Sequence, residues 1–97
     1  TRSKLRPALI VSDERFHRAL PDVIVCPVSS QPRYYRRPGP GDCPLRRWQA
    51  VGLRHPSTVR ISNIVSIEKS LIDRVLGTVR DGDLATVVGG LCEAFGL

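Results

Sequence analysis

Two short apolar runs near the start of the sequence constrain the fold most. They cover residues 6–12 (RPALIVS) and 23–31 (VIVCPVSSQ). Their β-branched content favours buried strands over helices. A cation opens the first run, and neighbouring hydroxyl groups lie near the end of the second. If the two strands pair, Arg6, Ser29 and Ser30 meet at one end of the sheet.

The length of 97 residues predicts a single domain over residues 1–97. A chain of this size buries only about 60–65% of its unfolded surface, so the core is modest and a second subunit is a plausible source of stability. No apolar stretch approaches the roughly 18 residues of a membrane span, and the start of the sequence lacks a signal-peptide core. We therefore expect a cytoplasmic protein without a membrane partner.

The charge balance points to a polyanionic partner. Fifteen Lys and Arg residues face nine Asp and Glu residues, which gives a net charge of +6. Residues 33–37 (RYYRR) and 46–48 (RRW) interleave arginines with aromatic rings, a combination suited to phosphate contact and base stacking. A basic surface without a partner, and a solvated loop over these residues, are the competing interpretations.

Further elements follow from local patterns. Residues 13–22 predict a polar connection with one helical turn around Phe16 and Ala19. The many Pro and Gly residues between 32 and 47 predict a long loop without regular structure. The remaining expectations are helical turns over 45–53 ended by Gly52, a β region over 58–67 with Val59, Ile61, Asn63 and Val65 on one face, a turn at 68–70, and a strand over 73–79.

The clearest helix lies at the end of the sequence. Its apolar stripe consists of Leu84, Val87, Val88, Leu91 and Phe95, with Asp81 or Asp83 capping its start. Gly89 and Gly90 make sense if this face approaches a sheet or another subunit closely. Short strands followed by one helix predict a small β-barrel or curled sheet with the helix packed on it.

No metal or cofactor site is expected. The three cysteines are far apart, which argues against a disulfide framework and against a zinc site. Cys26 lies in a predicted strand and Cys92 on the apolar face of the predicted helix, so both are predicted to be small core residues. Cys43 is predicted to be an exposed thiol in the Pro/Gly-rich loop. His17 and His55 are isolated and are expected to be structural or solvated.

Cleavage of RNA is a reaction that needs no metal, because RNA supplies its own nucleophile. The 2′-hydroxyl must be held in line, and the charge that develops on phosphorus must be stabilised. A guanidinium and a hydroxyl meet that need, so Arg6 with Ser29 forms a minimal candidate set. An arginine in a surface ion pair is the alternative interpretation.

The residues that carry a family resemblance extend over most of the chain. They are the stretches 4–12 (KLRPALIVS), 23–30 (VIVCPVSS), 42–45 (DCPL), 48–53 (WQAVGL), 55–60 (HPSTVR) and 67–71 (IEKSL). In this order, with an amphipathic helix at the end, the chain resembles the MazF/PemK (Kid-like) toxins of bacterial toxin–antitoxin systems.

The resemblance implies an SH3-like barrel with a C-terminal helix, a homodimer, and a metal-independent endoribonuclease. Such toxins cut single-stranded RNA, leave a 2′,3′-cyclic phosphate, and are neutralised by a cognate antitoxin. The catalytic arginine and hydroxyl of the family fall on Arg6 and Ser29. The further residues for which we predict RNA contacts are Lys4, Ser30, Gln31, Arg33, Tyr34, Arg36 and Arg37.

Two departures from the family pattern carry expectations of their own. Relatives usually have a strand and a loop before the Arg-Pro motif, whereas this sequence has five residues there, so we expect the first strand to be missing and one sheet edge to be exposed. Many relatives carry Asp-Gln where this chain has Ser62-Asn63.

A truncated, non-catalytic RNA- or antitoxin-binding relative is therefore one alternative function. A CcdB-like toxin that acts on DNA gyrase through residues near Phe95 is another, although we expect Phe95 to lie in the core.

Overall fold

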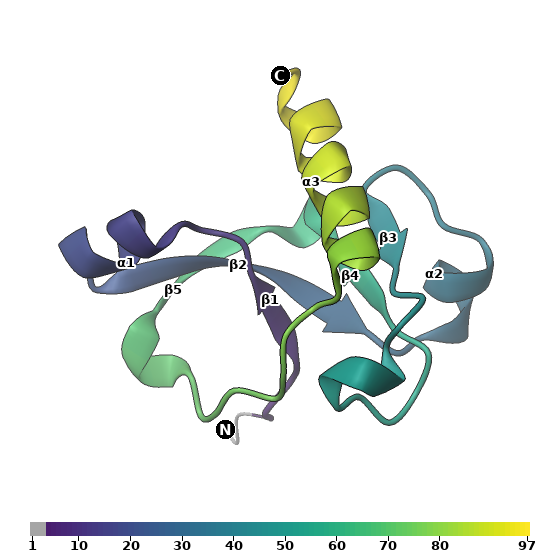
Figure 1. Ribbon diagram of the computed structural model, residues 1–97, viewed down its shortest axis with the longest axis horizontal. Coiled ribbons are helices and arrows are strands. Elements are labelled where there is room, and N and C mark those ends of the chain that lie inside the picture. The colour runs from purple at the N-terminus through teal and green to yellow at the C-terminus, as the bar shows by residue number, and fades with distance from the viewer. Residues whose placement is uncertain (1–3) are drawn as a thin grey trace.

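The computed structural model describes residues 4–97 and contains one antiparallel sheet with a helix standing on it (Figure 1). The sheet order is β1-β2-β4-β3, and β5 also pairs with β2. The strands are β1 (Ala8–Ile10), β2 (Asp22–Ser29), β3 (Asp42–Pro44), β4 (Thr58–Arg60) and β5 (Val65–Glu68).

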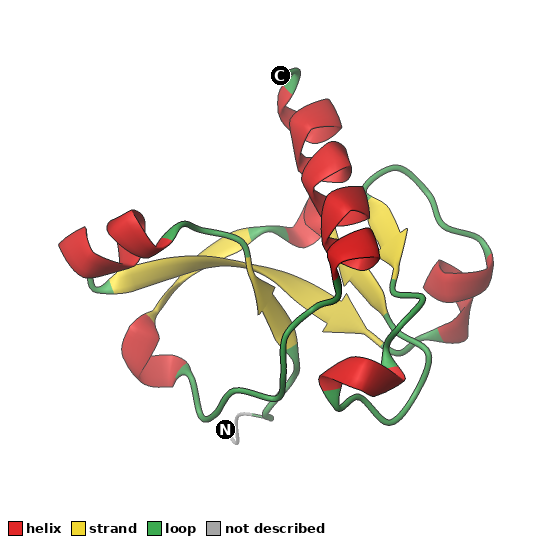
Figure 2. Ribbon diagram, viewed as in Figure 1, coloured by secondary structure: helices red, strands yellow, loops and turns green. Residues whose placement is uncertain are grey.

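Helices occupy the connections and the last segment (Figure 2). The α-helices are α1 (Glu14–Ala19), α2 (Pro32–Arg36) and α3 (Asp81–Phe95), and the 3₁₀ helices are η1 (Gln49–Val51), η2 (Ile61–Asn63) and η3 (Lys69–Leu71). The predicted turn around Phe16 and Ala19 is therefore confirmed as α1, and η1 ends at Gly52 with a φ of 86°, as predicted.

The two apolar runs pair as antiparallel strands, with Leu9 opposite Cys26. The ladder extends to the hydrogen bond that the Val28 amide donates to the Pro7 carbonyl, at 3.1 Å. β2 is the longest strand and holds the sheet together, because β5 pairs with its first half and β4 with its last two residues. Its Val25 and Cys26 side chains are buried.

The sheet is curled but open, so the predicted barrel is not closed among residues 4–97. β1 pairs only with β2, and β3 pairs only with β4. η2 separates β4 from β5, and both strands pair with β2. The predicted β region over 58–67 is interrupted there, and Asn63 and Val65 are exposed while Val59 and Ile61 are buried.

The strand predicted over 73–79 is wrong. Residues 72–80 carry no strand and form the extended connection that leads into α3 (Figure 2). A strand needs a neighbour to complete its hydrogen-bond ladder, and no strand within residues 4–97 pairs with this segment.

The loop predicted over 32–47 is wrong at two places. Pro32 stands in the first turn of α2, where the missing amide hydrogen has no helical partner to lose. Asp42, Cys43 and Pro44 form β3 against β4. Cys43 is consequently a core residue with 5% exposure rather than an exposed thiol, and burial raises the pKa of its thiol.

α3 packs on the sheet as far as Leu91 and projects away from it through its last turn (Figure 1). Val87 is buried, whereas Leu84, Val88 and Phe95 are exposed, so the predicted stripe is only partly a core face. Phe95 is 60% exposed, which corrects its expected place in the core. Leu84 and Val88 follow the buried Asp83 and Val87 by one position each, so their side of the helix turns away from the sheet.

The predicted side-chain cap of α3 is also wrong. The N-cap residue is Arg80, without a side-chain cap. The buried Asp83 carboxylate instead accepts hydrogen bonds from the backbone amides of Arg46 and Arg47, at 3.0 and 2.9 Å. Asp83 thus ties the start of α3 to the segment after β3.

Gly90 lies where the sequence predicts a close approach. A Cβ at this position would lie 2.7 Å from Ile61 Cδ1 and 3.1 Å from Cys43 Sγ, whereas a Cβ at Gly89 would meet nothing within 4 Å. Of the two glycines, Gly90 is required by packing.

Candidate nucleic-acid interface

The two residues predicted to be catalytic, Arg6 and Ser29, lie at the same end of the β1–β2 ladder. Arg6 precedes Pro7 and Ser29 follows Val28, so both stand just outside the last hydrogen bond of the ladder. Arg6 is exposed, and its side chain makes no hydrogen bond or ion pair within residues 4–97. Its guanidinium is therefore free to meet an anion at this end of the sheet.

The Ser29 hydroxyl is oriented by the backbone that follows it. Its Oγ accepts a hydrogen bond from the Gln31 amide at 3.2 Å. A hydroxyl has one proton to donate, and this contact leaves that proton unused. Ser29 can thus donate to a phosphate oxygen.

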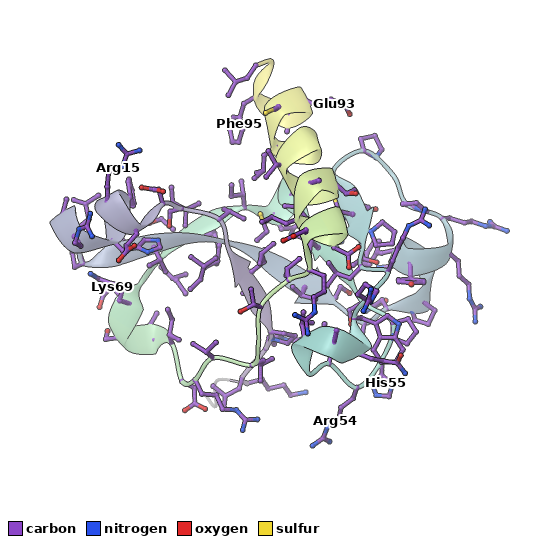
Figure 3. All side chains as sticks on the ribbon, in the orientation of Figure 1. Arg15, Arg54, His55, Lys69, Glu93 and Phe95 are labelled. Carbon is purple, nitrogen blue, oxygen red and sulfur yellow. The ribbon has the colours of Figure 1, made fainter. Side chains whose placement is uncertain are left out.

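An open groove continues from this strand end along α2. It has a volume of about 660 Å³ and is lined by Ser30, Pro32, Tyr35, Arg36, His55 and Pro56. The Tyr35 hydroxyl donates to the Leu45 carbonyl at 3.2 Å, which fixes the ring in the wall of the groove. His55 and the neighbouring Arg54 lie on the side of the molecule away from the free end of α3 (Figure 3).

A second cluster forms on the other side of α2 around Tyr34. The Arg60 guanidinium lies over the Tyr34 ring at 3.6 Å from its centroid, and that of Arg33 at 4.8 Å. Arg33 Nη2 also donates to the Tyr34 hydroxyl at 2.9 Å, and this hydrogen bond lowers the pKa of the phenol. The cluster presents two guanidinium groups around one aromatic ring.

Asp42 fixes the position of Arg60. Arg60 Nε donates to Asp42 Oδ1 at 2.6 Å, and the Gly39 amide donates to Oδ2 at 2.9 Å. The side chains of Asp42 and Arg60 are only 6% and 21% exposed. Arg60 Nη2 also reaches Ser62 Oγ at 3.4 Å, and the Ser62 hydroxyl donates to Asn63. We call Tyr34, Asp42 and Arg60 the Arg60 cluster.

The predicted site residues thus lie in two neighbouring groups. Arg6, Ser29, Ser30 and Gln31 surround the strand end, and Lys4 is exposed on the segment leading to it. Arg33, Tyr34 and Arg36 stand on α2, and Arg37 follows it.

Sequence reasoning did not assign His55, Asp42 and Arg60 to the site, and it included Tyr35 only as part of the segment 33–37. His55 and Arg60 belong to stretches that carry the family resemblance, but nothing local assigns them a contact.

Neither a metal site nor a membrane span is found in the described part of the chain. Within residues 4–97 there is no group of three His, Cys, Asp or Glu side chains arranged to hold a metal ion. His17 is engaged in a hydrogen bond with Ser12, in agreement with its expected structural role. The helices described are too short or too polar to cross a bilayer.

Comparison with known families identifies the architecture. Residues 1–95 match the PemK-like, MazF-like toxin family of type II toxin–antitoxin systems. The chain belongs to this family. The resemblance drawn from the sequence motifs is thereby confirmed.

Solved structures of toxins share the fold. The Mycobacterium tuberculosis toxin MazF-mt6 is 25% identical with a TM-score of 0.79, and the match covers 95% of this chain and 87% of that chain. An endoribonuclease in complex with its cognate antitoxin, from a mycobacterial species, is also 25% identical with a TM-score of 0.79, covering 95% and 82%. A MazE–MazF structure from Deinococcus radiodurans, 23% identical with a TM-score of 0.74 over 94% and 85%, supports the fold alone. A search of curated proteins finds no match.

Proposed function

We propose that this toxin-family chain is an endoribonuclease that cuts single-stranded RNA without a metal ion. The observation that carries the proposal is the placement of Arg6 and Ser29 at the shared end of the β1–β2 ladder, beside the arginine-bearing helix α2. Arg6 supplies an exposed guanidinium, and Ser29 supplies a hydroxyl proton that its hydrogen bond with Gln31 leaves unused, so the two meet the needs of a phosphate that gains charge.

In the proposed reaction the 2′-oxygen attacks the adjacent phosphorus while the bond from phosphorus to the 5′-oxygen breaks. The proton of the 2′-hydroxyl leaves to solvent, and the 5′-oxygen takes up a proton from solvent. The products are a 2′,3′-cyclic phosphate and a 5′-hydroxyl. Arg6 donates two hydrogen bonds to the phosphate oxygens and Ser29 donates one, which stabilises the charge of the transition state.

Membership of the toxin family also supports proposals about the partners of this chain and its compartment. A structural relative is an endoribonuclease crystallised with its cognate antitoxin, which supports neutralisation of this chain by an antitoxin of its own. The exposed apolar side chains of α3, at Leu84, Val88 and Phe95, support a homodimer or an antitoxin contact. We place this activity in the bacterial cytoplasm, where the RNA substrate is found.

Cleavage of a long single-stranded RNA in excess EDTA tests the proposal. We expect discrete fragments that end in a 2′,3′-cyclic phosphate. Ser29→Ala should slow cleavage by about tenfold or more, because one donor to the phosphate is lost, and Ser29→Thr should restore it because the hydroxyl returns. Intact RNA after incubation with folded protein contradicts the proposal.

A second candidate function is inhibition of DNA gyrase through the C-terminal residues. The observation that favours it is the exposure of Phe95 and Leu97, at 60% and 92%. Figure 3 shows Phe95 at the projecting end of α3. A gyrase supercoiling assay separates the two candidates: inhibition that is lost in Phe95→Ala and retained in Arg6→Ala supports action on gyrase.

A further inference from the structure

The groove lined by Ser30, Pro32, Tyr35, Arg36, His55 and Pro56 is not used in the proposed reaction. It is open to solvent and begins at Ser30, the residue next to Ser29. A nucleotide bound in it would therefore neighbour the phosphate at the strand end.

Ring-bearing side chains make up most of its wall. Tyr35 and His55 contribute aromatic faces, and Pro32 and Pro56 contribute pyrrolidine rings. The Tyr35 ring is held by its hydrogen bond to the Leu45 carbonyl, and the loop of His55 is held by the bond that the Ser57 hydroxyl donates to the His55 carbonyl, at 2.8 Å. A wall of fixed rings suits the face of an unstacked base.

The polar groups of the groove are mostly donors. Arg36 is exposed, offers five N–H groups and has no acceptor, and the Ser30 hydroxyl can donate as well. A guanidinium matches two adjacent acceptors, and guanine presents O6 and N7 side by side on an edge that carries no donor. An unpaired cytosine also presents N3 and O2 side by side, but its amino group lies on the same edge and would approach the guanidinium donors. Adenine places an amino group beside N7, and an N–H separates the two carbonyl oxygens of uracil.

We propose that this groove binds one unstacked guanine of single-stranded RNA, with Arg36 donating to O6 and N7 and the rings of Tyr35 and His55 contacting the base face. This inference deepens the proposed function, because it names the base that the toxin recognises beside the scissile phosphate. The net charge of +6 and the arginines of α2 attract the RNA backbone without regard to sequence, and the groove adds the selection of a base.

Binding of uncleavable RNA separates this inference from the catalytic one. The probes are four fluorescent 2′-O-methyl oligonucleotides of uridine with guanine, adenine, cytosine or uracil at the central position, measured by fluorescence anisotropy at fixed salt. We expect the guanine probe to bind about tenfold more tightly than the others. Replacing that guanine by 7-deazaguanine should remove most of the preference, because N7 is lost.

Two arginine variants complete the test. Arg36→Ala should abolish the preference for guanine, whereas Arg37→Ala removes the same charge outside the groove and should weaken all four probes alike. Circular dichroism verifies that both variants fold. Equal binding of the four probes, or a guanine preference that survives Arg36→Ala, overturns the inference. A chain that prefers guanine but leaves RNA intact refutes the proposed cleavage and not the groove.

Discussion

Arg6 and Arg60 stand in two neighbouring regions of the molecule and have opposite environments. Arg6, at the strand end, is exposed, and its side chain has no partner within residues 4–97. Arg60 is largely enclosed and held by the Asp42 carboxylate, the Tyr34 ring and Ser62. A carboxylate that already neutralises a guanidinium competes with any phosphate that approaches it.

This contrast distinguishes an arginine that is available to a ligand, Arg6, from an arginine that stabilises the fold, Arg60. Removing Arg6 takes away no side-chain hydrogen bond or ion pair within residues 4–97, so the effect should appear in activity. Removing a member of the Arg60 cluster leaves a buried partner unsatisfied, so the effect should appear in stability. The following predictions test this contrast.

Arg6→Ala should lower RNA cleavage by about 10²–10³-fold, because the principal donor to the phosphate is lost. The free energy of unfolding should change by less than about 0.5 kcal/mol. Initial cleavage rates and urea denaturation measure the two effects. Arg15→Ala is the control, because it removes the same charge from α1, at the far end of the sheet (Figure 3). Wild-type cleavage by Arg6→Ala would show that the strand-end site is not the active site.

Asp42→Asn should destabilise the protein by about 2 kcal/mol, because it removes the charge that Arg60 faces in a mostly enclosed pair. Urea denaturation measures the change. Asp13→Asn is the matched control, since the Asp13–Arg15 pair is exposed and Asn is an equally good N-cap for α1. If both substitutions have the same small effect, Asp42 and Arg60 do not stabilise the fold.

Gly90→Ala should destabilise the protein by about 1–2 kcal/mol, because its Cβ would collide with the buried Ile61 and Cys43 side chains. Gly89→Ala, one residue away in open space, should stabilise it by up to about 1 kcal/mol through helix propensity. Thermal unfolding of the pair measures both effects. Effects of the same sign would mean that α3 does not approach β3 and η2 as closely as described.

The smallest effect concerns the ionisation of Tyr34. The hydrogen bond from Arg33 lowers the pKa of its phenol below the ordinary value of about 10. The stabilisation that comes from this lowered pKa is absent at neutral pH, where the phenol is protonated in both the folded and the unfolded state. It builds as the pH rises through the folded pKa and is complete above the unfolded pKa. The ultraviolet difference titration between wild type and Tyr34→Phe isolates the group, and Arg33→Leu should move its midpoint upward. A midpoint that does not respond to Arg33→Leu would contradict this contact.

Elements with a local signal were predicted from the sequence. β-Branched content predicted β1 and β2, and the apolar stripe predicted α3. Contacts between distant segments were not accessible in this way. The Asp42–Arg60 pair joins residues 18 positions apart across the β3–β4 ladder. The Pro- and Gly-rich composition of residues 32–47 predicted a loop where the structure has α2 and β3. The false strand over 73–79 has the same cause, because a strand requires a partner that no local pattern reveals.

The site residues Arg6 and Ser29 were named from the needs of a phosphate that gains charge and again from the family motif, and the strand register brings them to one end of the sheet. Their catalytic role stays a prediction. The groove could not be predicted, since Tyr35 and His55 meet only when the chain after β2 and the chain before β4 lie side by side.

The place of α3 in the chain has a consequence for the order of events during synthesis. The core formed by Cys26, Cys43, Val59 and Ile61 is completed by Val87, and Asp83 fastens the segment after β3. All the strands therefore leave the ribosome before the residues that lock them in place. The ribosome shields the most recently made segment, so a nascent chain holds Arg6 and Ser29 long before it holds a finished domain. The core of this domain therefore stays incomplete until α3 has left the ribosome.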